Sequence, residues 1–309
     1  QMENFNVKYK PTNINDCFIS DKNKSIINRF IKNNSFANMI FAGNIGCGKS
    51  TVIDIITKNI KDIDIQRLNV LLIDVKHIFS SLERIVAINK RNGKRTLFII
   101  NDFHILKPKI QINFAILLEK VRNDSLFFIE TTNILEIVPQ IQNLMIIIKF
   151  DNMNKNQYVS FVNGICDKEN MKVDNKVINQ LSIITNGDIK CTLNYLTALK
   201  GIGDNIDNEM FESIFGIPSS VSINKIINGI IECNKELVLN ECDKLIKEKF
   251  DCNEIMIKLF NGIIEEDIDE DDKHKLLEKL GKKIYKFNKY QESNDKLKVY
   301  VKSLLDLFK

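Results

Sequence analysis

Residues 43–50, with the sequence GNIGCGKS, satisfy the pattern GxxxxGK[ST], in which a glycine-rich turn binds phosphate groups. Glycines let the backbone curl so that successive N–H groups point inward at a polyphosphate. Lys49 is expected to reach the outer phosphates, and the Ser50 hydroxyl is expected to hold Mg²⁺. A capped turn is the alternative interpretation. The residues predicted to bind the nucleotide are Gly43, Asn44, Ile45, Gly46, Cys47, Gly48, Lys49, Ser50 and Thr51.

The flanking residues predict the elements that would position this loop. Residues 38–42 form a short apolar run before it, and apolar residues recur at helical spacing after it. Such a helix adds the positive end of its dipole to the loop. Further strands are expected at 67–73, 95–101, 125–131 and 144–150, with an amphipathic helix over 110–121. This alternation predicts an α/β fold with a parallel sheet covered by helices on both faces.

The strand pattern ends at Phe150, and the remaining residues have helical periodicity. Residues 154–199 predict three or four helices, with Asn186-Gly187-Asp188 as a helix stop followed by a capped start. Residues 215–222 are the best candidate linker. We therefore expect three domains: a nucleotide-binding core over 1–151, a helical lid over 152–215 and an all-α collar over 216–309.

Composition describes an ordinary globular chain, with 309 residues, 44% hydrophobic and 27% charged. The net charge of +4 permits contact with nucleic acid without demonstrating it. Seven scattered cysteines favour reduced, mostly buried thiols, and three distant histidines argue against a histidine-rich metal site. Neither a signal peptide nor a membrane span is predicted. We expect a nuclear or cytoplasmic protein that is not secreted and has no membrane partner.

Several motifs, in this order, carry a family resemblance over about residues 5–308: VKYKP at 7–11, the phosphate loop, ETTN at 130–133, GDIKCTLN at 187–194 and a helical tail that contains KLLEKLGKKIYKF. Together they resemble a small subunit of the replication factor C clamp loader, an AAA+ protein. The divergent motifs and the heavy use of Asn, Ile and Lys hint at a viral member, which would act at a viral replication site.

The resemblance implies an AAA+ core, a helical lid and a collar through which five different subunits form an open ring. Such a ring binds ATP and Mg²⁺, opens a sliding clamp, sets it on primer-template DNA and releases it on hydrolysis. By the same resemblance, Tyr9 and Pro11 would lie near the adenine and Asn133 would be a polar sensor. For Asn133 the alternative is a turn residue after a strand. Lys190 would take the lid sensor position, where the family usually has arginine; lysine keeps the charge but loses the bidentate fork.

Two family features are altered in this chain. The family has an aspartate that supports Mg²⁺ and a glutamate that polarises water; here Asn101 and Asp102 follow the strand. Asparagine leaves the metal charge unneutralised, and aspartate is one methylene too short. The arginine that enters a neighbouring subunit's site is replaced by Leu144. We expect Ser50, Asn101 and Asp102 at the metal, Asp102, Asn133 and Lys190 in catalytic positions, and impaired hydrolysis.

Contacts with DNA are expected from lysines at a helix N-terminus, because clamp loaders follow duplex phosphates with such termini. Lys107 and Lys109 are the candidates, with Lys76 and Arg84 behind them. Ile78 and Phe79 are either clamp-facing anchors or core residues. Two other functions remain open: a standalone AAA+ ATPase of the replication-initiation or helicase-loading type, and a non-hydrolysing scaffold subunit. The first usually appends a DNA-binding helix-turn-helix, whereas this tail resembles the collar.

Overall fold

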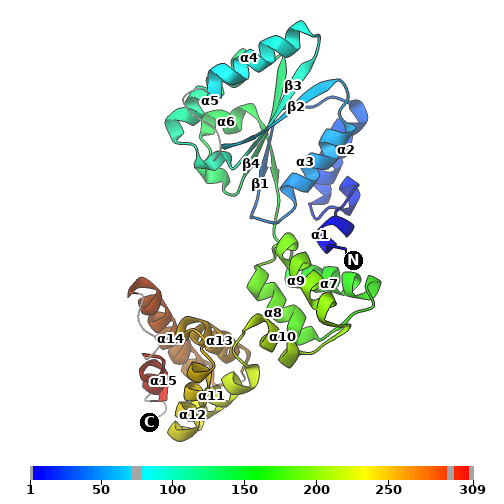
Figure 1. The fold of residues 1–309 in the computed structure, drawn as a ribbon. Coiled ribbons are helices and arrows are strands. Elements are labelled where there is room, and N and C mark those ends of the chain that lie inside the picture. Colours follow the sequence, from blue (N-terminus) through cyan, green and yellow to red (C-terminus); the bar gives the residue numbers. More distant parts are fainter. Residues whose placement is uncertain (1–2, 71–77, 267, 291–295, 306–309) are drawn as a thin grey trace. The chain divides into compact units, whose positions relative to one another are not determined.

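The structure is a computed structural model that describes residues 3–70, 78–266, 268–290 and 296–305. Two compact units divide the chain, Gln1–Asn205 and Ile206–Lys309, and each is described by itself (Figure 1). The predicted lid, 152–215, is divided between them, because its last helix falls in the second unit. The three-domain division therefore stays a prediction.

The first unit contains a five-stranded sheet in the order β2-β3-β4-β1-β5, and every neighbouring pair is parallel. This confirms the predicted α/β class. The central strands are continuous apolar runs because both faces of the sheet are covered. The strands are β1 (Met39–Ala42), β2 (Ile63–Asn69), β3 (Arg95–Asn101), β4 (Ser125–Thr131) and β5 (Ile146–Lys149).

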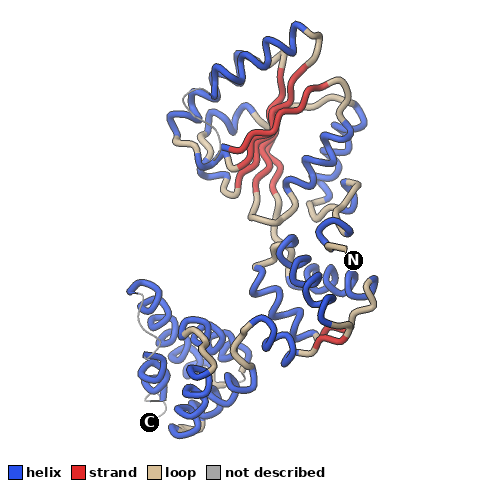
Figure 2. The backbone as a smooth tube through the Cα atoms, in the orientation of Figure 1, coloured by secondary structure: helices blue, strands red, loops and turns tan. Residues whose placement is uncertain are grey.

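Helices cover the two faces of the sheet and bury two separate apolar clusters (Figure 2). On one face, α2 (Asp21–Asn33) and α3 (Lys49–Asn59) pack against Phe41, Ile99 and Phe128. On the other face, Ile40, Ile100 and Ile129 meet three helices. These are α4 (Ile78–Arg91), α5 (Pro108–Lys120) and α6 (Pro139–Leu144).

Strand β2 differs from the sequence prediction, which placed it at 67–73. It occupies the edge of the sheet, where only one neighbour is paired and alternate side chains are partly exposed. An edge strand does not need a continuous apolar run, so the start of β2 at Ile63 gave little signal in the sequence. Residues 71–73 of that prediction lie outside the described residues.

Three helices follow the sheet in the first unit: α7 (Lys155–Lys168), α8 (Asn175–Thr185) and α9 (Ile189–Ile202). The predicted stop and start at 186–188 is confirmed. Asn186 ends α8 in the left-handed conformation, with φ 48°, and the Asp188 carboxylate accepts a hydrogen bond from Cys191 N at 2.8 Å, which caps α9. The short strands β6 (Lys172–Val173) and β7 (Asn205–Ile206) form a two-stranded sheet.

Short helices complete the first unit. Helix α1 (Phe5–Lys8) precedes the sheet, and η1 (Ile14–Asp16) follows it closely. The 3₁₀ turns η3 (Phe103–Ile105) and η4 (Ile134–Glu136) begin directly after β3 and β4. Both turns therefore lie at the carboxyl edge of the sheet, which is where ligands bind in open parallel sheets.

After Ile206, which belongs to β7, every regular element in the described part of the second unit is a helix: α10 (Asn208–Phe215), α11 (Ser220–Ile231), α12 (Lys235–Lys247), α13 (Cys252–Glu265), α14 (Glu270–Tyr290) and α15 (Leu297–Leu305). Its core includes the fully buried Ile226, Leu245 and Leu259. A buried ion pair between Lys258 Nζ and Glu212 Oε1, 2.6 Å apart, joins α13 to α10. This contact explains why α10 belongs to the second unit.

Among the described helices, no single one is long and apolar enough to cross a membrane. Helices α10 and α11 reach that length and hydropathy only as a pair, and the pair bends by 100° at its break.

Candidate nucleotide-binding site

The phosphate loop joins β1 to α3, as predicted, and two glycines shape it. Gly46 and Gly48 have φ of +72° and +96°, a region that favours glycine, and Gly48 is the residue from which α3 begins. Lys49 Nζ donates hydrogen bonds to the carbonyl oxygens of Gly43 and Asn44, each at 2.6 Å. The ammonium group is thus held over the loop, where phosphate oxygens would meet it together with the N–H groups of the first turn.

A cavity of about 470 Å³ lies over this loop. Several parts of the first unit line it: the N-terminal segment, the loop with the start of α3, the carboxyl ends of β3 and β4, Phe150 after β5, Phe161 of α7 and the start of α9. Its lining includes most of the predicted site residues, namely Tyr9, Pro11, Ile45, Gly46, Cys47, Gly48, Lys49, Ser50, Thr51, Asn101, Asp102 and Lys190. Gly43, Asn44 and Asn133 are not part of it; the first two take part only through the carbonyls that hold Lys49.

The second predicted motif lies at the end of β3. Asn101 is the last residue of this strand, and Asp102 follows in the left-handed conformation with φ 56°. Aspartate and asparagine tolerate this backbone better than other non-glycine residues because their short polar side chains can hydrogen-bond locally. The backbone therefore gives a physical reason for the shorter acid at position 102.

Glu130, the next-to-last residue of β4, is the site residue to which the sequence analysis gave no role. Its side chain is only 6% exposed, and its Oε2 accepts a hydrogen bond from Ser50 Oγ at 2.8 Å. Burial raises the pKa of Glu130, while the Ser50 hydrogen bond and the Lys49 charge oppose the shift. An acidic residue near the end of an otherwise apolar strand was the signal that could have identified it.

Asn133, the expected polar sensor, makes a local capping contact in the structure, and its role as a sensor stays a prediction. Its side chain accepts a hydrogen bond from Leu135 N at 3.0 Å and caps η4, which is the turn role considered as the alternative. The residue beside it, Thr132, lines the cavity instead, and its Oγ1 lies 3.1 Å from His104 Nε2. A hydroxyl group therefore also lines the cavity just after β4.

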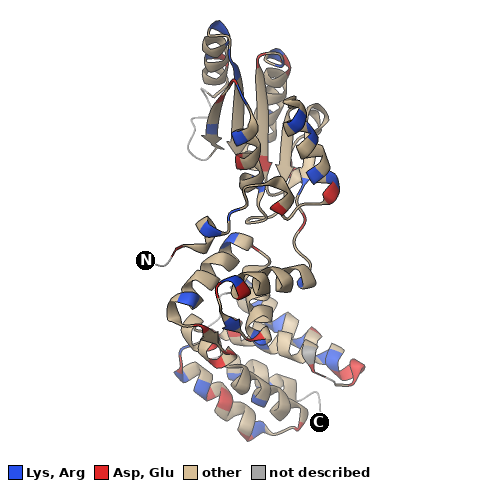
Figure 3. Cartoon of the chain, turned by 90° about the vertical axis from the view of Figure 1, so that its right-hand side faces the viewer, with Lys and Arg blue, Asp and Glu red and all other residues tan. Residues whose placement is uncertain are grey.

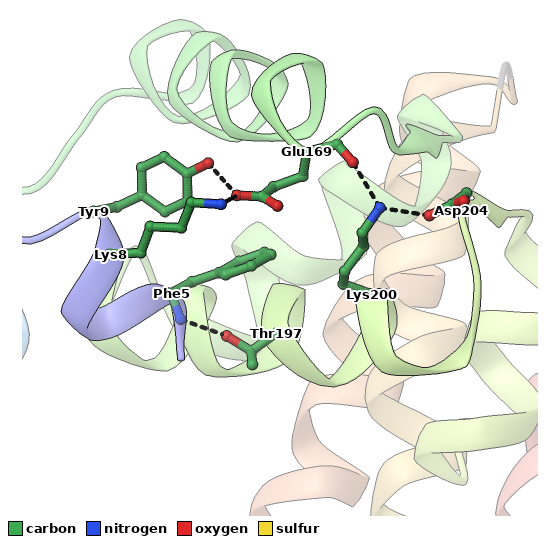
Figure 4. Close-up of polar contacts among 7 residues, drawn as sticks. All are labelled: Phe5, Lys8, Tyr9, Glu169, Thr197, Lys200 and Asp204. Carbon is green, nitrogen blue, oxygen red and sulfur yellow. Dashed lines mark hydrogen bonds and ion pairs between the residues drawn. The ribbon is translucent and has the colours of Figure 1, made fainter. Parts of the chain in front are cut away.

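The N-terminal segment forms a wall of the cavity and is tied to the helices that follow the sheet (Figure 4). Phe5 N donates to Thr197 Oγ1 at 3.1 Å, and the Phe5 side chain is buried. The Tyr9 hydroxyl donates to Glu169, which also pairs with Lys8 at 2.6 Å. Burial, followed by the hydrogen bond to Glu169, raises the pKa of Tyr9 to about 12. This segment therefore positions Tyr9 and Pro11 at the cavity.

The start of α9 closes another side of the cavity. Ile189 N donates to Gly46 O at 3.3 Å, and a Cβ added to Gly46 would lie 1.9 Å from an Asp188 carboxylate oxygen. Loop and helix therefore meet without room for a side chain. Lys190, in the first turn of α9, is exposed and lines the cavity, so its ammonium can reach a ligand there.

The predicted DNA and clamp residues have different surroundings. Lys107, which caps α5, and Lys109, in its first turn, are exposed, as is Arg84 on α4. Lys76 lies outside the described residues. Ile78 is only 4% exposed and Phe79 packs against the same core, so both are core residues, the second of the two interpretations. In Figure 3, basic and acidic residues are interspersed along the helices of each unit.

The structure also shows where Leu144 and the cysteines lie, and whether the described side chains could bind a metal ion by themselves. Leu144, where the family has its arginine finger, is the last residue of α6 and is partly exposed. All seven cysteines fall within the described residues as reduced thiols, and five of them are buried. The part of the chain that is described contains no group of three or more His, Cys, Asp or Glu side chains that could hold a metal ion by themselves. A metal at this site would need phosphate and water ligands as well.

Comparison with solved structures supports the class of fold. The Thermotoga maritima RuvB Holliday junction branch migration motor matches with a TM-score of 0.51 and 15% identity, covering 72% of this chain and 79% of that one. No protein-family model matches the chain. The chain therefore shares its fold with this motor over the matched part, in which a five-stranded parallel sheet covered by helices is followed by further helices.

Comparison with curated proteins identifies relatives that are named as replication factor C subunits. A putative replication factor C small subunit of Acanthamoeba polyphaga mimivirus is 23% identical and covers 78% of this chain and 77% of that one. The replication factor C small subunit of Archaeoglobus fulgidus is 22% identical over the whole of both chains. A probable replication factor C subunit 5 of Dictyostelium discoideum is 23% identical over 85% of this chain and 79% of that one. These relatives confirm the resemblance to replication factor C small subunits.

Proposed function

We propose that this chain is an ATP-binding subunit of a clamp loader that opens a sliding clamp and places it on primer-template DNA. The observation that carries the proposal is the phosphate loop at the start of α3, where Lys49 and Ser50 line a cavity of about 470 Å³. Chains named replication factor C small subunit, similar over most of this sequence, supply the rest. ATP with Mg²⁺ is the proposed ligand.

The residues at the cavity fit a magnesium nucleotide. Backbone N–H groups and Lys49 would hold the phosphates, and the Ser50 hydroxyl would ligate the metal. One buried carboxylate oxygen, Glu130 Oε1, accepts no hydrogen bond within the described chain. Lys190 would neutralise phosphate charge from the lid side, and Tyr9 and Pro11 would border the base. When bound, Mg²⁺ supplies charge neutralisation between the outer phosphates.

We further propose that this subunit hydrolyses ATP slowly. Asp102 is shorter than the glutamate used to polarise water, and Asn101 brings no charge to the metal. A neighbouring subunit would also receive no arginine from position 144. The chain would then bind ATP as a switch for assembly, while other subunits do most of the chemistry.

The proposed partners are sibling AAA+ subunits in a ring, a sliding clamp and DNA. The all-helical second unit is the proposed collar, with Lys107 and Lys109 at the N-terminus of α5 as proposed phosphate contacts. This end of the helix has no acidic residue in its first turn, which suits an anion. In the proposed organisation, residues 152–215 form the lid and residues 216–309 form the collar.

Nucleotide titration followed by steady-state turnover tests this function. We expect ATP to bind the isolated chain with turnover near background, and mixing with sibling subunits to give a defined complex that loads a clamp. A standalone ATPase would instead turn over ATP briskly without siblings. Failure of the unaltered chain to bind any adenosine nucleotide at millimolar concentration would refute the proposal.

A further inference from the structure

Magnesium at a phosphate loop needs negative charge from the protein as well as a hydroxyl. Mg²⁺ prefers oxygen ligands and is usually held through one or two carboxylates together with phosphates and water. In phosphate-loop enzymes that carboxylate comes from the strand that carries the second motif. Here this strand, β3, ends in Asn101, which has no charge to offer.

Glu130 brings a carboxylate to the same place from the next strand. Strand β4 lies between β3 and β1, and the last paired residues, Ile100 and Ile129, are followed by Asn101 and Glu130. Side chains alternate along strands, so these two residues share the face that carries Ile99 and Phe128. That face is covered by α3, whose first turn contains Ser50.

The contacts of Glu130 orient the Ser50 hydroxyl and leave one carboxylate oxygen without a hydrogen bond. Its Oε2 accepts the Ser50 hydroxyl hydrogen bond at 2.8 Å, and this holds the lone pairs of Ser50 Oγ available for another partner. The other oxygen, Oε1, is buried and receives no hydrogen bond from any described residue. A buried, unsatisfied polar atom costs about 1–3 kcal/mol, so a partner is expected when the site is filled.

The surrounding charges point to a cation as that partner. Asp102 and Glu130 both line the cavity, so two carboxylates lie at the site that Ser50 borders. Lys49 provides partial compensation, but its ammonium is already shared by two loop carbonyls. A divalent ion beside Ser50 would neutralise the negative charge that the two carboxylates bring to this site.

We propose that Glu130 supplies the carboxylate that positions Mg²⁺ at Ser50, in place of the acidic residue that β3 lacks. The acidic function has thus moved by one strand within the sheet. This inference rests on the proposed nucleotide site. Glu130 is assigned a positioning role, through Ser50 and a metal-bound water, and the phosphates remain bound by the loop.

The test compares ATP affinity, measured by calorimetry, in Mg²⁺ and in EDTA. We expect Mg²⁺ to tighten binding by the unaltered chain, and Glu130→Gln to remove about tenfold or more of that gain, as loss of a residue that orients a metal ligand does. Glutamine keeps the shape and an acceptor for Ser50, so affinity in EDTA serves as the control for an intact loop. Glu119→Gln, an exposed carboxylate on α5, is the matched control.

Rescue distinguishes metal positioning from a structural role. Asn101→Asp returns a carboxylate to β3, and in the Glu130→Gln background it is expected to restore most of the Mg²⁺-dependent gain. The affinity for Mn²⁺ in the ATP complex, followed by electron paramagnetic resonance, should fall in Glu130→Gln and recover in the double variant with Asn101→Asp. If glutamine at this position prevents folding, Glu130→Asp, which keeps the charge but is shorter, should lose part of the gain.

Different failures have different meanings. A gain from Mg²⁺ that survives both Glu130→Gln and Glu130→Asp would overturn the assignment of Glu130 and leave the nucleotide site standing. Loss in Glu130→Gln without recovery by Asn101→Asp would also overturn it, in favour of a structural role. Absence of ATP binding by the unaltered chain in either buffer would overturn the proposed function, and this inference with it.

Discussion

The phosphate loop and the end of β3 line the same cavity, but only the loop has all the residue types that its motif requires. The loop retains its glycines, Lys49 and Ser50, whereas β3 ends with an uncharged amide and a short acid. Holding a triphosphate requires N–H groups and a cation, whereas cleaving it also requires a well-placed base. The difference teaches that binding and hydrolysis are separable demands on one site.

The largest expected effect tests the loop. Lys49→Ala should weaken ATP binding by about hundredfold or more, because charged hydrogen bonds contribute about 1.5–3 kcal/mol each and this ammonium can meet several phosphate oxygens. Calorimetric titration measures it. Lys58→Ala, an exposed lysine in the last turn of the same helix, is the control and should leave affinity unchanged. Equal ATP affinities of the two variants would mean that the loop does not bind the nucleotide.

The next effect tests the end of β3. Asp102→Glu should raise turnover by about tenfold with little change in affinity, since the added methylene brings the carboxylate toward the attacking water and small misplacements of a base are costly. The left-handed backbone at 102 should make the variant less stable by about 1 kcal/mol. Turnover under saturating ATP gives the answer. Brisk turnover in the unaltered chain, abolished by Lys49→Ala, would contradict slow hydrolysis.

A smaller effect tests why the loop has kept its glycines. Gly46→Ala and Gly48→Ala both place a side chain at positive φ, which costs about 1–2 kcal/mol. Only Gly46→Ala also drives a methyl group into the Asp188 carboxylate that caps α9, adding about 1 kcal/mol. Denaturant unfolding of both variants measures the difference. Equal losses of stability would mean that the Asp188 contact carries no weight.

The smallest effect lies in the N-terminal wall. Tyr9→Phe removes the hydrogen bond to Glu169 and should lower stability by less than about 1 kcal/mol, because the pair is partly exposed. The raised pKa means that the contribution of Tyr9 to stability is complete below the unfolded pKa of 10.0 and is lost as pH rises through about 12. Phenolate absorbance during alkaline titration, compared with Tyr9→Phe, follows this ionisation. A Tyr9 that titrates near 10 would contradict the contact.

The sequence predicted much of the first unit, because local rules decide those elements. Strands at 95–101 and 125–131 have the predicted bounds, since buried parallel strands are continuous apolar runs. The turn at 186–188 followed from the preference of Asn for a left-handed cap and of Asp for a helix start. The phosphate loop was recognisable because its residue types are fixed by its backbone.

The remaining site could not be read from the sequence, because it depends on which strands are neighbours. Glu130 and Ser50 are far apart in the chain and meet only because β4 pairs with β1. Asn133 carried the expected amide, yet the turn after β4 uses that amide as a cap and presents Thr132 to the cavity. The capping hydrogen bond of Asn133 depends on the turn that follows β4, and the sequence pattern alone did not choose between that turn role and a sensor role.

The bond between Phe5 and Thr197 has a consequence for synthesis of the chain. The two residues are 192 positions apart, and the buried Phe5 ring packs in a segment that leaves the ribosome long before α9 exists. Chains are made from the N-terminus, and contacts of such separation close late. The Phe5 ring of α1 therefore stays exposed to water until α9 has been synthesised. The cavity wall that α1 and α9 form together is completed after the strands of the sheet have been made.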